Sequence, residues 1–172
     1  CYLEGYLTTS VTGKAANIEA RNLAQKHSIK TALTFSDPFV VEHFRDGFSE
    51  TIGDGIDLLF CNEAEALSYT QKDTVDDAIE VIKTFSKSFA ITLGAKGAVV
   101  YDGQNLVDID AHPVKAIDTN GAGDLFAGAF MFGLTRGMSF EQAGNLASKA
   151  SSQIVSQFGP RLKLAQYQAL TA

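Results

Sequence analysis

The chain has 172 residues, of which 45% are hydrophobic and 20% are charged. This length and composition are typical of one globular domain or of one large piece of a domain, which can bury a core without a disulfide framework or a structural metal. The 20 acidic residues outnumber the 14 basic ones, so the net charge is -6, and no cluster of Lys or Arg occurs. We therefore expect neither a nucleic acid nor a membrane surface as a partner.

Targeting and redox features indicate a cytoplasmic protein. No uncharged apolar run approaches the roughly 20 residues of a membrane span, and the amino-terminal sequence lacks the basic and then apolar pattern of a secretory signal. Cys1 and Cys61 lack CxxC spacing, which suits free thiols in a reducing compartment. Because the chain opens at Cys1 on an apolar segment, without an initiator Met, we expect it to be a piece of a longer protein.

Helices and strands alternate along the predicted chain. After an apolar, strand-like opening segment at 1–7, the predicted helices are 14–27, 39–52, 62–70, 75–85, 123–136 and 140–155, and the predicted strands are 31–35, 57–61, 89–93, 98–101 and 106–109. This alternation predicts βαβ units and a mostly parallel sheet covered on both faces, with one antiparallel hairpin at 98–109. Ligands bind such sheets at the carboxyl ends of the strands, so the loops that follow strands are the candidate sites.

The most informative stretch is Asp-Thr-Asn-Gly-Ala-Gly-Asp at residues 118–124, between an extended segment and an apolar helix. Its glycines and alanine let the backbone curl and expose several N–H groups at the positive end of a helix dipole, which makes an anion pocket. Asp124 is the candidate general base that accepts a proton from a hydroxyl attacking a phosphoryl group. The alternative is that Asp124 stabilises the first helical turn and that Asp118 organises the loop.

Two common phosphate motifs do not fit this stretch, because no GxxxxGK[ST] occurs and Phe126 stands where a dinucleotide fingerprint needs its third glycine. Residues 118–128 instead resemble the second signature of the PfkB-type carbohydrate and nucleoside kinases, the ribokinase-like family. The resemblance implies a three-layer α/β/α sandwich with a mostly parallel, Rossmann-like central sheet. It also implies that Asp124 is the catalytic base. The resemblance further implies that backbone groups of Gly121, Ala122 and Gly123 are catalytic, because they hold the developing charge.

Asn62-Glu63-Ala64-Glu65 follows an apolar strand and resembles the Asn-x-x-Glu element of the same family. The resemblance implies that Asn62 and Glu65 organise phosphates and Mg²⁺, with Glu65 holding the ion through water, and Mg²⁺ does usually keep several waters. The alternative is a capping pattern, in which Asn62 begins the helix and Glu65 returns to its backbone. Beside Asp124, we prefer the functional role.

Residues 92–97, Thr-Leu-Gly-Ala-Lys-Gly, resemble the nucleotide loop of the family. Gly94 and Gly97 allow the main chain to approach a ribose or phosphate closely, and Thr92 offers a hydroxyl. An ordinary turn uses the same glycines. In the last predicted helix Ser148 matches the small-residue wall that the family places against adenine. Other residues that the resemblance assigns are Ala143 and Ala147 on that wall, and Asp118, Asn120 and Gly159 in a loop that binds a monovalent cation, such as K⁺, in several relatives. Small residues at helical spacing are also typical of close helix packing.

Residues 3–7, 36–39 and 158–161 resemble the bacterial adenosine-kinase-like branch of the family. The resemblance covers nearly all of residues 1–172 but only the C-terminal, nucleotide-binding and catalytic part of a single domain. The family's amino-terminal part would carry the first strands, a β lid that can mediate a homodimer, a Gly-Gly element and the aspartate that binds the substrate's hydroxyls.

The resemblance implies a kinase that transfers the γ-phosphoryl group of ATP to a primary hydroxyl of a sugar or ribonucleoside, with ATP and Mg²⁺ as cofactors. One alternative is a catalytically silent nucleotide-binding or regulatory module on the same fold, since fold does not fix function. Retention of Asp124 argues against that alternative, because binding alone needs no base. A dinucleotide-dependent oxidoreductase lacks its glycine fingerprint and its ribose-binding acid.

Overall fold

A computed structural model describes residues 1–171 of the chain, which form two compact units: Cys1–Ile91 and a second unit that begins at Thr92. The strands of the first unit are β1 (Tyr2–Glu4), β2 (Ala32–Thr34), β3 (Leu58–Asn62) and β4 (Phe89–Thr92), in that spatial order. Its helices are the 3₁₀ helix η1 (Gly5–Thr9) and the α-helices α1 (Val11–Lys26), α2 (Pro38–His43), α3 (Arg45–Ile52), α4 (Glu63–Thr70) and α5 (Val75–Ile82).

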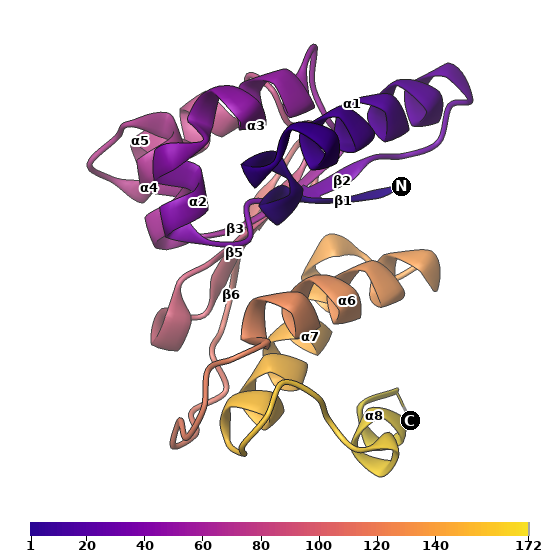
Figure 1. The fold of residues 1–172 in the computed structure, drawn as a ribbon. Coiled ribbons are helices and arrows are strands. Elements are labelled where there is room, and N and C mark those ends of the chain that lie inside the picture. Colours follow the sequence, from indigo (N-terminus) through magenta and orange to yellow (C-terminus); the bar gives the residue numbers. More distant parts are fainter. Residues whose placement is uncertain (172) are drawn as a thin grey trace. The chain divides into compact units, whose positions relative to one another are not determined.

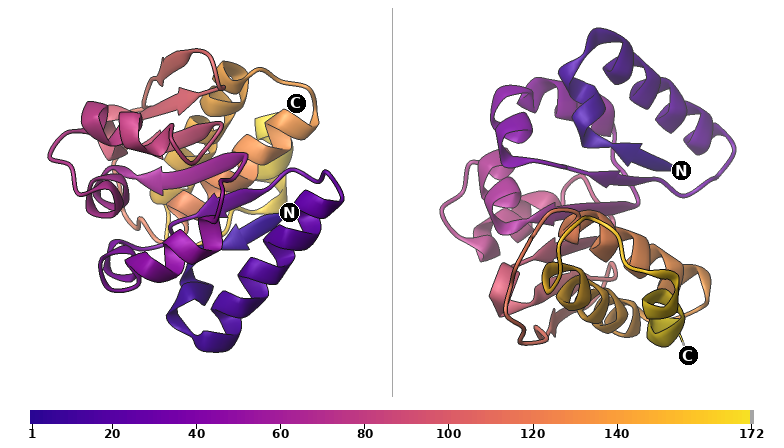
Figure 2. Two further views of the ribbon diagram at one scale, coloured as in Figure 1. Left: turned by 90° about the horizontal axis from the view of Figure 1, so that it is seen from above. Right: turned by 60° about the horizontal axis from the view of Figure 1, so that its bottom comes forward.

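The strands of the first unit pair in parallel, as the alternating pattern predicts. Leu3 of β1 lies opposite Leu33 of β2, and Leu33 lies opposite Leu59 of β3. The Leu59 N–H donates to the carbonyl of Ser88 just before β4, at 3.0 Å. In Figure 1 the helices of this unit lie above its strands, and Figure 2 shows β1, β2 and β3 side by side. Their carboxyl ends therefore share one edge.

Local side chains set where these helices begin. Ser10 accepts the Gly13 N–H at 3.0 Å and starts α1 three residues earlier than its apolar spacing predicts. The predicted helix at 39–52 is in fact two helices, because the backbone of Phe44 (φ -123°, ψ 29°) is not helical. The opening segment is a strand only over Tyr2–Glu4, after which the chain turns into η1.

An aromatic cluster fills the core of the first unit. The ring of Phe35 lies 5.1 Å from that of Phe48, edge to face, and 4.7 Å from that of Tyr69. Phe35 and Phe48 are fully buried, and the Tyr69 hydroxyl is 3.2 Å from Ser49 Oγ. Such pairs stabilise a core beyond the apolar area that they bury. The cluster fixes α3 and α4 against the end of β2.

The second unit contains a β-hairpin and a pair of packed helices. Its elements are the 3₁₀ helix η2 (Gly94–Lys96), strands β5 (Ala98–Tyr101) and β6 (Leu106–Ile109), and helices α6 (Ala122–Thr135), α7 (Phe140–Val155) and α8 (Leu164–Thr171). β5 and β6 pair antiparallel, as predicted, with Ala98 opposite Ile109. The sequence pattern gave no sign of α8, whose apolar residues have almost no helical periodicity.

Glycines bring α6 and α7 close together. A Cβ at Gly133 of α6 would lie 3.0 Å from the Cβ of Ala143 on α7, and a Cβ at Gly144 would lie 2.8 Å from Ile109 of β6. Phe130 of α6 packs edge to face on Phe140 at 5.3 Å. Because no side chain separates these elements, α7 is held firmly between α6 and the hairpin.

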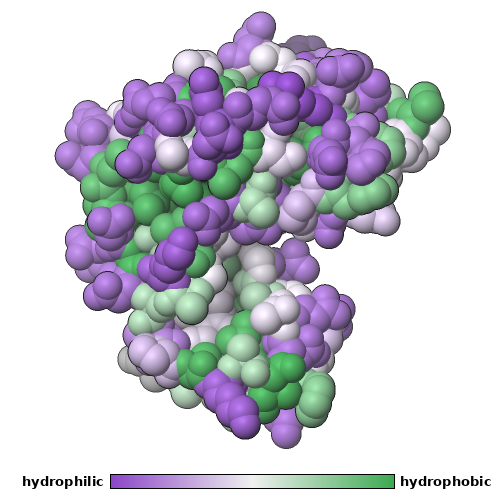
Figure 3. Space-filling view, turned by 90° about the vertical axis from the view of Figure 1, so that its left-hand side faces the viewer, coloured by the Kyte–Doolittle hydropathy of each residue, from purple (hydrophilic) through white to green (hydrophobic). Residues whose placement is uncertain are grey.

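The face of the first unit that is seen in Figure 3 is mainly polar. Most of the first unit that is visible in Figure 3 is hydrophilic, with apolar side chains in smaller patches. Over residues 1–171, no helix combines the length and the apolar composition that crossing a bilayer requires.

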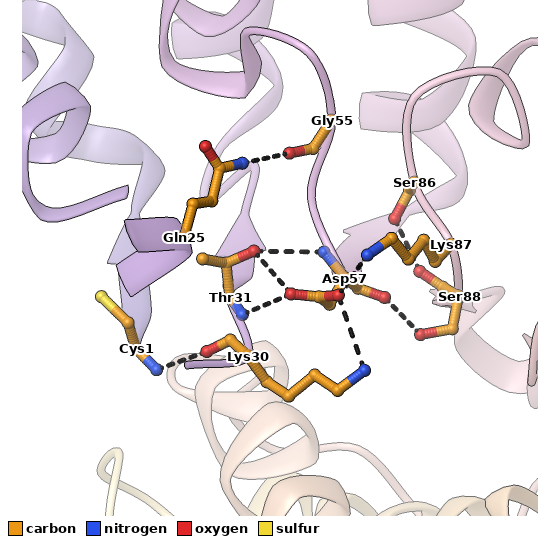
Figure 4. A network of polar contacts seen from close by, with 9 residues as sticks. All are labelled: Cys1, Gln25, Lys30, Thr31, Gly55, Asp57, Ser86, Lys87 and Ser88. Carbon is orange, nitrogen blue, oxygen red and sulfur yellow. Dashed lines mark hydrogen bonds and ion pairs between the residues drawn. The ribbon is translucent and has the colours of Figure 1, made fainter. Parts of the chain in front are cut away.

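A polar network joins the amino ends of three strands in the first unit (Figure 4). The Asp57 carboxylate accepts the Thr31 N–H at 2.8 Å and an ammonium hydrogen of Lys87 at 2.9 Å, and Lys30 Nζ lies 3.7 Å away. The Ser88 hydroxyl donates to the Asp57 carbonyl at 2.6 Å. Thr31, Asp57 and Ser88 lie at the starts of β2, β3 and β4, so this network aligns the strands at one edge.

We predict that Asp57→Ala lowers the free energy of unfolding at pH 7 by about 1–3 kcal/mol, because it leaves buried donors unpaired. Burial raises the pKa of the Asp57 carboxyl, but the hydrogen bonds from Lys87 and Thr31 outweigh burial and lower the pKa overall. This stabilisation is therefore present at neutral pH and lost as the pH falls below about 4.

Urea denaturation followed by circular dichroism between pH 3 and pH 7 measures the effect. The matched control is Asp54→Ala in the same loop, where the side chain is exposed. Equal destabilisation by both substitutions, or a loss that does not shrink in acid, would contradict the assignment.

Candidate functional site

A cavity of about 500 Å³ lies in the second unit, between the loop after β4, the segment after β6, the start of α6 and one face of α7. Six residues that the sequence singles out line it together: Thr92, Gly94, Gly97, Ala122, Gly123 and Ser148. Its volume is in the range of small-molecule and cofactor sites. The structure thus gathers these residues around one space, while their individual roles stay predictions.

The first turn of α6 presents backbone donors beside this cavity. Gly121 lies at the N-cap position just before the helix and has no side chain to cap it. The Ala122 N–H donates to the Thr119 carbonyl at 3.2 Å, and the Leu125 N–H donates to the Gly121 carbonyl at 3.0 Å. Gly123 and Asp124 lie between these two residues. Within residues 1–171, neither of their N–H groups has a protein acceptor. Unpaired donors at the positive end of a helix are groups with which an anion can pair, so an anion site here stays a prediction.

The two glycines of this turn have different reasons to be glycine. Gly121 has φ +77°, and a Cβ there would lie 2.8 Å from Pro160, so the fold itself requires glycine. Gly123 is already helical, and a Cβ built on it meets no atom within 4 Å. The folded backbone therefore requires glycine at Gly121 and not at Gly123. What remains beside Gly123 is open space at the cavity wall.

The loop before α6 is braced by Asp118. Its carboxylate accepts the Asn120 N–H at 3.0 Å and the Gly159 N–H at 3.0 Å. Both bonds lower the pKa of Asp118, and the bond from Asn120 has the larger effect. The Ile117 N–H donates to the Val155 carbonyl at the end of α7, at 2.7 Å. Asp118, Asn120 and Gly159, the residues predicted for a cation loop, are thus joined by hydrogen bonds. Asp118 organises the loop, as the alternative to a functional role predicts. Cation binding by Asp118 stays a prediction.

The loop after β4 is a tight turn closed by the Leu93 N–H, which donates to the Gly97 carbonyl at 2.8 Å. Gly97 has φ +95°, and a Cβ there would clash with the carbonyl oxygen of Ile109. Gly94 has φ +60° and faces open space. The turn alternative therefore accounts for Gly97, whereas Gly94 leaves room beside the cavity.

The α7 wall agrees with the prediction only in part. Ser148 lines the cavity, and its hydroxyl donates to the Asp110 carbonyl at 2.8 Å. Ala143 and Ala147 are fully buried and do not line the cavity, and Ala143 packs against Gly133. For these two alanines the helix-packing alternative is right, because their small size serves contact between elements.

His112 also lines the cavity, although the sequence analysis assigns it no role. The signal available was its place just after the hairpin, since the return strand of a hairpin brings the following segment back beside the loop that precedes the hairpin. Asp124 lies on the first turn of α6 and is exposed.

In the first unit Asn62 and Glu65 form a complete capping box. The Asn62 N–H and amide group donate to the Glu65 carboxylate at 2.9 and 2.7 Å, and the Glu65 N–H donates to Asn62 Oδ1 at 2.8 Å. The capping alternative is therefore realised. Among residues 1–171 no group of three or more His, Cys, Asp or Glu side chains is placed to hold a metal ion. A role of Glu65 toward Mg²⁺ through water, and its place relative to the cavity, stay predictions.

Glu65 is 4% exposed and lies near other acids at the carboxyl ends of the strands. Burial raises the pKa of Glu65 to about 7, the Asn62 N–H opposes this shift, and the Asp37 and Glu4 carboxylates add to it. Glu4 ends β1, Asp37 follows β2, and Glu65 follows β3. Strand ends that share one edge therefore gather three carboxyl groups, which favours protonation of the buried one.

Comparisons with known proteins agree with this architecture. Residues 1–166 match the family model described as pfkB family carbohydrate kinase. The structure of adenosine kinase from Sinorhizobium meliloti is 37% identical, with a TM-score of 0.91, and a probable sugar kinase from Rhizobium etli CFN 42 is 34% identical, with a TM-score of 0.92. Both alignments cover 99% of this chain, and 54% and 52% of those chains respectively. These likenesses confirm the ribokinase-like α/β fold.

Adenosine kinase 2 from Arabidopsis thaliana is 28% identical over 173 residues, which is 92% of this chain and 49% of that protein. The chain thus spans about half the length of these relatives.

We predict that replacing Glu65 flattens the dependence of stability on pH. Because the folded pKa of about 7 lies above the ordinary value of 4.5, the protonated form stabilises the fold at low pH, and this contribution is lost as the pH rises through about 7. The loss is on the order of 1–3 kcal/mol.

In Glu65→Gln we expect the part of the decline in folding stability between pH 5 and pH 8 that comes from this carboxyl group to disappear. Chemical denaturation across that range measures it, with Glu19→Gln on the exposed face of α1 as control. A slope that is unchanged in Glu65→Gln would contradict a neutral buried carboxyl.

We predict that Gly123→Ala keeps or raises stability, since alanine is favoured over glycine in a helix by up to about 1 kcal/mol. The new methyl group fills space beside the unpaired donors, so the affinity for a non-hydrolysable ATP analogue should fall about tenfold, or ~1.4 kcal/mol. Isothermal titration calorimetry and thermal unfolding measure the two effects.

Gly128→Ala is the matched control, because Gly128 lies on the same helix and a Cβ there also meets no atom within 4 Å. It should stabilise the helix equally and leave the affinity unchanged. If Gly123→Ala binds as tightly as the control, the turn does not contact the nucleotide.

Proposed function

The chain belongs to the pfkB family of carbohydrate kinases, and we propose that it carries the nucleotide-binding and phosphoryl-transfer part of an ATP-dependent kinase that phosphorylates a primary hydroxyl of a sugar or ribonucleoside. The observation that carries this proposal is the first turn of α6. There the unpaired N–H groups of Gly123 and Asp124 lie beside the Asp124 carboxylate, next to a cavity of suitable volume for a nucleotide.

Each part of this turn has a chemical task in the proposal. The two N–H groups stabilise the charge that develops on the phosphoryl oxygens as the bond to the leaving group breaks. The Asp124 carboxylate accepts the proton of the attacking hydroxyl, which is the task of a general base. The cavity between Gly94 and Ser148 receives the nucleoside part of ATP and holds it for in-line attack.

Kinases of this family use ATP and Mg²⁺ in general. When bound, Mg²⁺ neutralises phosphate charge and usually keeps several waters. Within this chain Glu65 is the residue we assign to it, through water, with Asn62 orienting the carboxylate by the hydrogen bonds of the capping box. Dependence on K⁺ through the Asp118 loop is part of the same proposal.

The acceptor is proposed from the relatives. The similar structures are an adenosine kinase and a probable sugar kinase, and at 37% the identity to the former supports the adenosine-kinase-like branch. We propose adenosine or a similar ribonucleoside as the first acceptor to test, and a free sugar such as ribose or fructose as the second.

We predict that Asp124→Asn lowers the rate of phosphoryl transfer by a factor of about 10² to 10⁴ and leaves the affinity for an ATP analogue within about twofold, because the amide keeps the size of the side chain and cannot accept the proton. The assay uses the natural protein that contains this chain, with ATP, Mg²⁺ and a panel of adenosine, other nucleosides, ribose and fructose.

Asp108→Asn on the exposed side of β6 is the matched control and should keep full activity. Equal turnover of Asp124→Asn and the wild type would refute the base assignment. ATP binding by a wild type that phosphorylates no acceptor would support the silent nucleotide-binding module instead.

A further inference from the structure

We propose that Ser151 of α7 is a positioning residue for the anion site at the start of α6. The inference rests on the proposed function and adds a residue to it. The Ser151 hydroxyl donates to the carbonyl oxygen of Ala122, at 3.2 Å. Ala122 is the first residue of α6 and directly precedes the two residues whose N–H groups are unpaired. The bond therefore ties the donor-bearing turn to the neighbouring helix.

Other contacts hold the approach to this turn, but they act before α6 begins. Pro160 packs against Gly121, and the Asp118 carboxylate joins the loop to the Gly159 N–H. Gly121 offers no side chain to cap the helix. Ser151 contributes a side-chain bond to the turn itself, from a helix that Gly144 holds against β6.

The direction of this bond matters for the chemistry. A hydroxyl that donates to the Ala122 carbonyl fixes the peptide plane between Ala122 and Gly123, because the carbonyl and the Gly123 N–H belong to one planar unit. The Gly123 N–H is one of the two unpaired donors, so its orientation toward an anion follows from the orientation of this carbonyl. Ser151 thus orients a donor through the backbone of Ala122, and the residue also lines the cavity.

The expected effect on stability is small, whereas the effect on rate is larger. Loss of one neutral hydrogen bond changes the stability of the fold only slightly. Misplacement of a reacting group by about 1 Å can lower a rate by about 10²-fold. Loss of the Ser151 hydroxyl should therefore reduce kcat more than it reduces stability or nucleotide affinity.

The test compares Ser151→Ala, Ser151→Thr and Ser156→Ala in the natural protein. Ser156 at the end of α7 is the matched control, because its hydroxyl also donates to a carbonyl, that of Gln153 on its own helix, at 2.8 Å. We expect Ser151→Ala to lower kcat about tenfold with KM for ATP within about twofold. We expect Ser151→Thr to restore kcat, because it keeps the hydroxyl, and Ser156→Ala to match the wild type.

A second readout does not depend on activity. In ¹H–¹⁵N spectra, titration with inorganic phosphate should shift the Gly123 and Asp124 N–H signals in the wild type and in Ser151→Thr, and shift them less in Ser151→Ala. If the wild type transfers no phosphoryl group but these shifts differ as stated, the proposed kinase fails and the positioning role stands. If kcat and the shifts in Ser151→Ala equal those of the wild type, or if threonine does not rescue them, the role of Ser151 is refuted.

Discussion

Two backbone N–H groups at the start of α6 have no acceptor in the described part of the chain, and the second unit is built to hold them. Pro160 and Gly159 follow α7 and support the loop before the turn, while Ser151 on α7 binds the Ala122 carbonyl. Leaving donors unpaired costs stability unless water or a ligand pairs with them. The supports come from one helix and the loop that follows it, so the position of α7 controls the geometry of the proposed anion site.

The first unit shows how parallel strands sort charge between two edges. At the amino ends, Lys87 and Thr31 donate to Asp57 and lower its pKa. At the carboxyl ends, burial raises the pKa of Glu65, and the nearby Asp37 and Glu4 add to the shift. Two acids at opposite ends of strand β3, Asp57 before it and Glu65 in the helix after it, therefore contribute to stability in ways that change with pH in opposite directions. The acids differ because the donors from Lys87 and Thr31 outweigh burial at Asp57, whereas burial outweighs the Asn62 donor at Glu65.

Much of this arrangement follows from the sequence, because periodicity and turn chemistry are local. The alternation of strands and helices, the hairpin and the start of α6 were predicted closely. Six of the residues that the sequence singles out line one cavity, and their roles stay predictions. The break at Phe44, the helix η1 and the helix α8 were not predicted, since apolar spacing does not register a short change of backbone conformation. Ala143 was misplaced for a related reason: a small side chain is equally suited to a ligand wall and to helix contact, and only packing distinguishes them.

Gly121 and Gly123 show the same limit most sharply, because they are indistinguishable in sequence and differ in cause. Gly121 is constrained by its positive φ and by Pro160, which are properties of the folded chain alone. Gly123 has a helical backbone and open space where a Cβ would stand, so nothing in the described chain forbids alanine there. Alanine would even be favoured by helix propensity. A glycine that the fold does not need, in a turn with two unpaired donors, agrees with the proposed function, in which a bound anion approaches this backbone closely.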